Sequence, residues 1–167
     1  MESISHSSAA PTGIGVICRW FAVLGCIIFA LEAVMSVVSI LGRTTIQVAV
    51  PGDYELVGML SAAGVALCLP YCEYRHGNVF VDFFTLWAPP GLKGFLDCIA
   101  RILLAVVAFL LAWRCWVGML EMREYSETSM VLSLPIWYAY IPLAPSFVLL
   151  GITALLNAFN LQKTEVR

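Results

Sequence analysis

Four long apolar segments dominate the sequence, and each is long enough to cross a lipid bilayer. They cover residues 17–41, 54–72, 94–120 and 135–159. A helix needs about 20 predominantly apolar residues to span the hydrocarbon core, where the backbone polar groups must be paired by the protein itself. None of the segments alternates strictly between apolar and polar residues, as the strand of a closed barrel would. The sequence therefore predicts an all-α integral membrane protein, with four transmembrane helices in one domain at 17–160.

The composition supports a lipid environment. Apolar residues make up 61% of the chain and charged residues 12%, whereas a soluble domain has about 45–50% and about 25%. So few charges cannot cover a water-facing surface. The nine Lys and Arg residues are scattered and the net charge is −2, so the basic patch of a nucleic-acid-binding protein is missing.

Basic residues near the helix ends predict the orientation. Residues 1–16 are expected to form a flexible tail and 161–167 a short C-terminal tail, and the first apolar segment is too long for the core of a signal peptide. If the N-terminus is cytoplasmic, two basic residues, Arg43 and Arg123, face the opposite side. Five then face the cytoplasm: Arg19, Arg75, Lys93, Lys163 and Arg167. Basic residues favour the cytoplasmic side, so both termini are predicted to be cytoplasmic.

The connection between the second and third helices has an unusual composition. Residues 76–87 are strongly apolar but too few to cross the membrane. The sequence fits a short amphipathic helix in the membrane interface and, equally well, a loop folded over the end of the helices.

Three charged residues interrupt the apolar segments: Glu32, Arg101 and Arg114. Placing such a charge at the centre of the bilayer costs at least about 2.5 kcal/mol, so it normally faces protein or water. Glu32 and Arg114 lie at depths that allow an interhelical pair, and Arg101 follows Asp97 at the i,i+4 spacing of a helix pair. The charges could line a substrate or ion pathway or join helices and subunits. The second interpretation is favoured, because a pathway needs several converging polar groups.

Small residues recur in the second segment at four-residue spacing. Gly58, Ala62 and Ala66 form a ridge on which another helix can pack closely. The pattern predicts a helix contact there but does not identify the partner.

No catalytic or metal-binding pattern is present. Six cysteines lie in or beside apolar segments, and His76 is alone outside the N-terminal tail, so the ligand count favours packing over zinc binding. No phosphate-binding loop or catalytic triad can be assembled. The chain is therefore predicted not to be an enzyme and to hold no cofactor or metal.

Three stretches carry a resemblance to a known family. Arg43 closes the first helix and Glu55-Leu56 opens the second; the other two stretches are residues 74–82 and 128–142. Together they resemble the small permease subunit of a tripartite ATP-independent periplasmic (TRAP) transporter of the bacterial inner membrane. The resemblance covers the chain from the first helix to the fourth.

The resemblance implies a supporting role in transport. A large permease subunit is expected to hold the substrate and sodium sites, and a periplasmic binding protein to deliver an organic acid or similar solute. The small subunit packs on the scaffold of the large one. Pro135, Trp137 and Tyr140 are then expected at the periplasmic side near the binding protein, although interfacial anchoring would equally explain the two aromatics. A free-standing four-helix scaffold or assembly protein, and the small subunit of a tripartite tricarboxylate transporter, are the alternatives.

Overall fold

The described part of the fold consists of four long α-helices. A computed structural model describes residues 13–45, 47, 51–75 and 90–165, with side chains for those between 13 and 75 and for 96–158. The helices are α1 (Gly13–Thr45), α2 (Asp53–Tyr74), α4 (Pro90–Glu124) and α5 (Trp137–Glu165). All four are long and apolar enough to cross a membrane, which confirms the prediction of an all-helical membrane protein. The expected interfacial segment at 76–87 lies outside the described residues.

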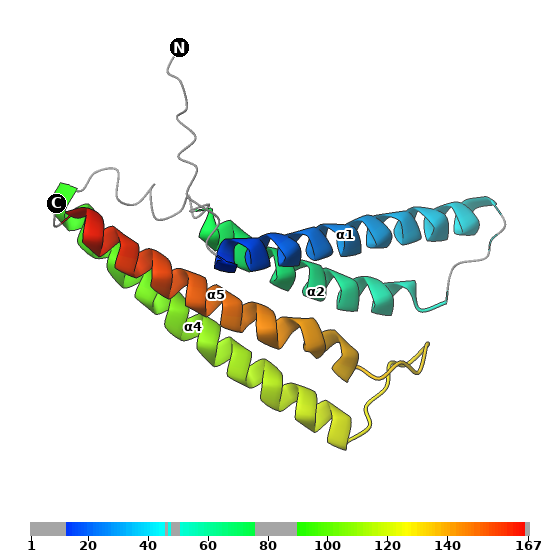
Figure 1. Cartoon of the computed structure of the whole chain (residues 1–167). Helices are drawn as coiled ribbons and strands as arrows, with labels where there is room; N and C mark the ends of the chain where they lie inside the picture. The colour runs from blue at the N-terminus through cyan, green and yellow to red at the C-terminus, as the bar shows by residue number, and fades with distance from the viewer. Residues whose placement is uncertain (1–12, 46, 48–50, 76–89, 166–167) are drawn as a thin grey trace, which may run out of the picture.

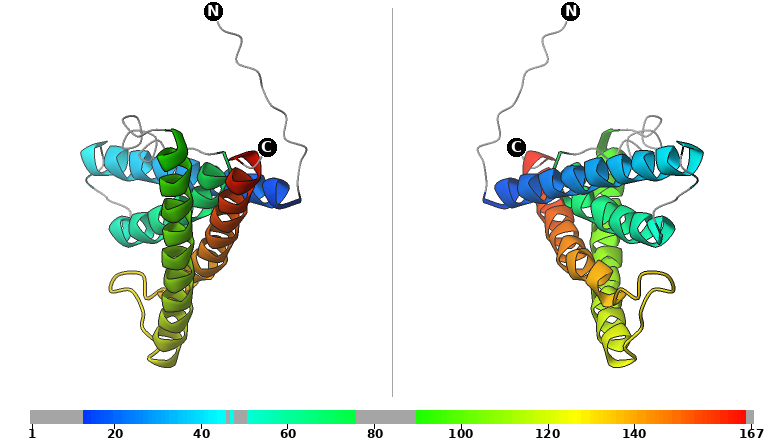
Figure 2. Two further views of the ribbon diagram at one scale, coloured as in Figure 1. Left: turned by 90° about the vertical axis from the view of Figure 1, so that its left-hand side faces the viewer. Right: turned by 90° about the vertical axis from the view of Figure 1, so that its right-hand side faces the viewer.

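The helices form two antiparallel hairpins that cross at an angle. One hairpin contains α1 and α2, and the other contains α4 and α5 (Figure 1). The α1–α2 hairpin lies crosswise to α4 (Figure 2). The hairpins contact each other mainly through α2 and α5, and α1 does not contact α4 in the described part of the chain. The molecule is therefore an open arrangement with α2 and α5 inside and α1 and α4 outside.

Small residues set the distance between the helices of each hairpin. A Cβ atom at Gly25 of α1 would lie 2.9 Å from the carbonyl oxygen of Gly64 in α2, so the two backbones meet there directly. In the other hairpin, a Cβ atom at Gly151 of α5 would lie 2.9 Å from the ring of Phe109 in α4. Buried alanines line the rest of this second contact: Ala105, Ala108, Ala112, Ala144, Ala154 and Ala158.

The ridge expected on the second helix is divided between two environments. Ala66 is buried at 3% exposure, but Gly58 and Ala62 are exposed and a Cβ atom at Gly58 would meet nothing within 4 Å. The inner face of α2 instead carries Ala63, Gly64 and Leu67. Contact of Gly58 and Ala62 with another subunit stays a prediction.

We expect Gly151→Val to destabilise the α4–α5 hairpin, because the added methyl groups enter the space of the Phe109 ring. Overpacking of this kind costs about 1–3 kcal/mol. The measurement is the melting temperature of the purified chain in detergent. Gly58→Val is the matched control, since it makes the same change in a helix facing open space. Equal melting temperatures for the two variants would contradict the packing described here.

Candidate functional site

A buried carboxylate joins three helices at the C-terminal end of α2. Glu73, in the last turn of α2, is 2% exposed. Arg101 of α4 reaches its Oε1 atom at 3.5 Å. Asn157 of α5 donates its amide to the Glu73 backbone oxygen at 2.8 Å and to Oε1 at 3.2 Å. A buried charge is tolerated when it is paired and hydrogen-bonded, so this cluster fixes the α2 end against the α4–α5 hairpin.

Glu32 pairs within its own hairpin rather than with Arg114. Ser61 of α2 donates its hydroxyl to Glu32 Oε1 at 2.7 Å. The expected Glu32–Arg114 pair is wrong, because α1 and α4 do not contact each other in the described part of the chain. Glu32 Oε2 is buried without a hydrogen-bond partner among the described residues. Arg114 is exposed on α4.

At the opposite end of α2, Glu55 holds the α4–α5 loop. Its carboxylate accepts a hydrogen bond of 2.5 Å from the Ser129 hydroxyl and bonds of 3.1 Å and 3.3 Å from the backbone N–H groups of Val131 and Leu132. Leu132 also packs over Gly52, where a Cβ atom would overlap Leu132 Cγ. Gly52 has φ +75, a conformation that favours glycine. Glu55 and Gly52 together fix this loop on the start of α2.

The loop has a defined backbone of its own. The Ser129 N–H donates to the Leu134 carbonyl at 2.8 Å, and the Ile136 N–H donates to the Glu127 carbonyl at 3.1 Å. Met130 at its tip is 98% exposed. The loop therefore presents an apolar tip on a held backbone. Below the tip, a groove of about 530 Å³ separates it from α2, lined by residues that include Tyr54, Gly58, Met59 and Ile136.

The three residues expected on the periplasmic side lie at the junction of this loop with α5. Pro135 forms an isolated antiparallel bridge with Thr128. Trp137 begins α5 and carries the Arg123 guanidinium 5.8 Å from its ring centroid. A Cβ atom at Gly118 would lie 3.5 Å from Tyr140 Cε1. Both aromatic residues thus contact α4, and their place near a binding protein stays a prediction.

Sequence reasoning missed the acidic residues that make most of these contacts. Glu55 and Glu73 stand at the ends of an apolar segment, where a charge needs no special explanation. Asp53 was missed for the same reason: it accepts a 2.6 Å hydrogen bond from Ser39 and lies 3.4 Å from Arg43. The signal available was the clustering of acids in the first turn of α2, which also favours helix formation.

The Glu55–Ser129 contact brings together two of the stretches that carry the family resemblance. In comparison with known families, residues 32–164 match the model described as tripartite ATP-independent periplasmic transporters, DctQ component. The chain belongs to this family. Separate comparisons with curated proteins and with solved structures found no match.

The DctQ component is the small membrane subunit of a TRAP transporter, and it is not an enzyme. Membership implies a complex with a large membrane subunit and a periplasmic solute-binding protein. The matched range includes Glu32, Glu55, Glu73, Arg101 and Asn157. The polar contacts described above therefore lie within the family domain of a multi-pass membrane protein.

We expect Glu55→Ala to release the α4–α5 loop, because three donors lose their acceptor at once. The measurement is the rate of chymotrypsin cleavage between residues 125 and 136 in the purified DctQ subunit, and a several-fold increase is expected. Glu127→Ala is the matched control, because it removes the same charge from the loop itself. Cleavage of the Glu55 variant at the wild-type rate would show that the carboxylate does not hold the loop.

Proposed function

We propose that this DctQ subunit packs against the scaffold of the large permease subunit and supports it during solute uptake. The transported solute is an organic acid or similar compound delivered by the periplasmic binding protein. Uptake is driven by sodium, and the sodium and substrate sites lie in the large subunit. The complex resides in the bacterial inner membrane.

The open arrangement of the helices is the observation that carries this proposal. In a closed four-helix bundle each helix packs between two neighbours. Among the described helices, α4 packs along α5 and reaches α2 through the Arg101–Glu73 ion pair, and α1 packs mainly against α2. The outward faces are apolar, with Leu31 and Val34 of α1 at 61% and 63% exposure and Leu103 of α4 at 62%. Such faces suit packing against further transmembrane helices.

The polar contacts favour a static support over a transport pathway. Glu32 bonds Ser61, and Glu73 bonds Arg101 and Asn157, so these charges join helices of the same subunit. A pathway is built from discontinuous helices with several converging polar groups. The contacts at the two ends of α2 instead fix the position of one hairpin relative to the other.

The proposed orientation places both termini in the cytoplasm. The Glu55–Ser129 contact and the apolar loop tip then lie on the periplasmic side, where the binding protein arrives. Pro135, Trp137 and Tyr140 support the base of that loop. These three residues contribute to the periplasmic surface by holding the α4–α5 loop in place.

Co-expression with the large subunit tests this function. The DctQ subunit would carry a C-terminal green fluorescent protein, which fluoresces when it folds in the cytoplasm. We expect a fluorescent one-to-one complex after detergent extraction, and sodium-gradient-driven uptake of an organic acid in cells that contain both subunits and the binding protein. Cells without the DctQ subunit are the control. A DctQ subunit that leaves the membrane alone, or uptake that does not depend on it, would contradict the proposal.

A further inference from the structure

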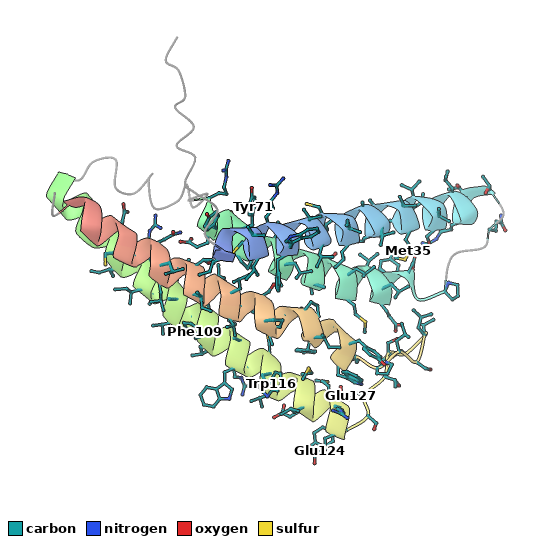
Figure 3. All side chains as sticks on the ribbon, viewed as in Figure 1. Met35, Tyr71, Phe109, Trp116, Glu124 and Glu127 are labelled. Atoms are coloured by element: carbon teal, nitrogen blue, oxygen red, sulfur yellow. The ribbon has the colours of Figure 1, made fainter. Side chains whose placement is uncertain are left out.

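The side of α4 opposite α5 carries an apolar stripe interrupted by one charge. The buried positions Ala105, Ala108 and Ala112 define the side that faces α5. On the other side lie Leu103, Val107, Leu110 and Arg114, spaced four, three and four residues apart, and the three apolar members are 62%, 45% and 57% exposed. This spacing repeats every seven residues, as in a helix that packs lengthwise on another helix. Figure 3 marks Phe109, Trp116 and Glu124 along α4, with Glu124 at the end of the helix beyond the stripe.

Arg114 lies well inside the apolar part of α4. Residues 102–113 and 115–120 are uncharged on either side of it, and the next charged residue toward the helix end is Glu121, seven positions on. Seven residues correspond to about 10 Å of helix. Helical side chains lean toward the helix N-terminus, so the Arg114 side chain leans away from this nearer end. Extension to the lipid headgroups is therefore unfavourable for Arg114.

Arg114 has no ionic partner among the described residues of its own chain. It takes part in no ion pair or hydrogen bond in this part of the chain. There α4 packs along α5, and its ion pair with α2 is made by Arg101, 13 residues before Arg114. A second copy of the chain would not supply a partner readily. Residues 98–120 of α4 contain no acid, and Glu32 of α1 is turned to Ser61.

We propose that the stripe Leu103–Val107–Leu110–Arg114 is the contact surface for a transmembrane helix of the large subunit that presents a carboxylate to Arg114. This inference rests on the proposed function and adds to it the face and the chemistry of the contact. A helix can place a carboxylate at this depth, whereas the phosphates of lipids lie at the headgroup level. Ionisable residues inside membranes usually face protein and pair with one another.

The test compares Arg114→Leu and Arg114→Lys in the complex with the large subunit. If Arg114 pairs with a carboxylate, Leu leaves that acid unpaired, and the large subunit that co-purifies falls by about tenfold or more. Lys keeps the charge and retains most of the complex. Leu is the more favourable residue in lipid, so the yield of the DctQ subunit itself should not fall. A full yield of complex for Arg114→Leu would overturn the inference while leaving the proposed function intact.

A photo-crosslinker separates the inference from the proposed function. With p-benzoylphenylalanine in place of Leu110, illumination of the purified complex should join the two subunits, and mass spectrometry of the adduct should locate a helix that contains Asp or Glu. A stable complex that gives only lipid adducts would overturn the inference alone. Failure of the wild-type subunits to co-purify would overturn the proposed function and the inference together.

Discussion

A charged side chain within a membrane-spanning helix needs a partner, and in this DctQ subunit that need fixes how the two hairpins sit together. The second helix, α2, carries a carboxylate near each of its ends. Glu73 binds Arg101 and Asn157 at one end, and Glu55 binds Ser129 and the following backbone at the other. The hydrophobic effect gives no preference for one crossing of helices over another in lipid, because lipid tails are as apolar as the side chains. The two carboxylates supply the specific attachment.

This attachment divides the surface of the molecule between inner and outer helices. With α2 and α5 inside, α1 and α4 keep outward faces that no described helix covers. The two hairpins are fixed to each other, while the outward faces of α1 and α4 remain available for contact with another protein. Both properties suit a supporting component of a transporter. Arg114 lies on the outer side of α4, where none of the described residues of the chain pairs with it.

The length and composition of the apolar segments predicted the four helices, because a segment of about 20 apolar residues has the length that a helix needs to cross the bilayer. The partners of the charges could not be predicted in this way. The similar depth of Glu32 and Arg114 in the membrane predicted that they pair. Depth does not show which helices are neighbours, and α1 and α4 are not neighbours among the described helices. The spacing of Gly58, Ala62 and Ala66 identified one face of α2 but did not show whether that face packs against another helix of the chain. No partner was predicted for Glu55 or Glu73, because charges at helix ends are ordinary, although their hydrogen bonds extend over 74 and 84 residues of sequence.

The most direct test of the central claim is a double-mutant cycle on Glu73 and Arg101, followed as unfolding of the DctQ subunit in mixed micelles of increasing SDS content. Glu73→Gln keeps an acceptor for Asn157, and Arg101→Met removes the cation at similar volume. Removing one member of a buried pair typically costs about 3–5 kcal/mol. Each single change should therefore destabilise the protein by about this amount, and the double variant should recover much of the loss. Losses that simply add would show that the two side chains do not depend on each other, and the attachment at this end of α2 would have to lie elsewhere.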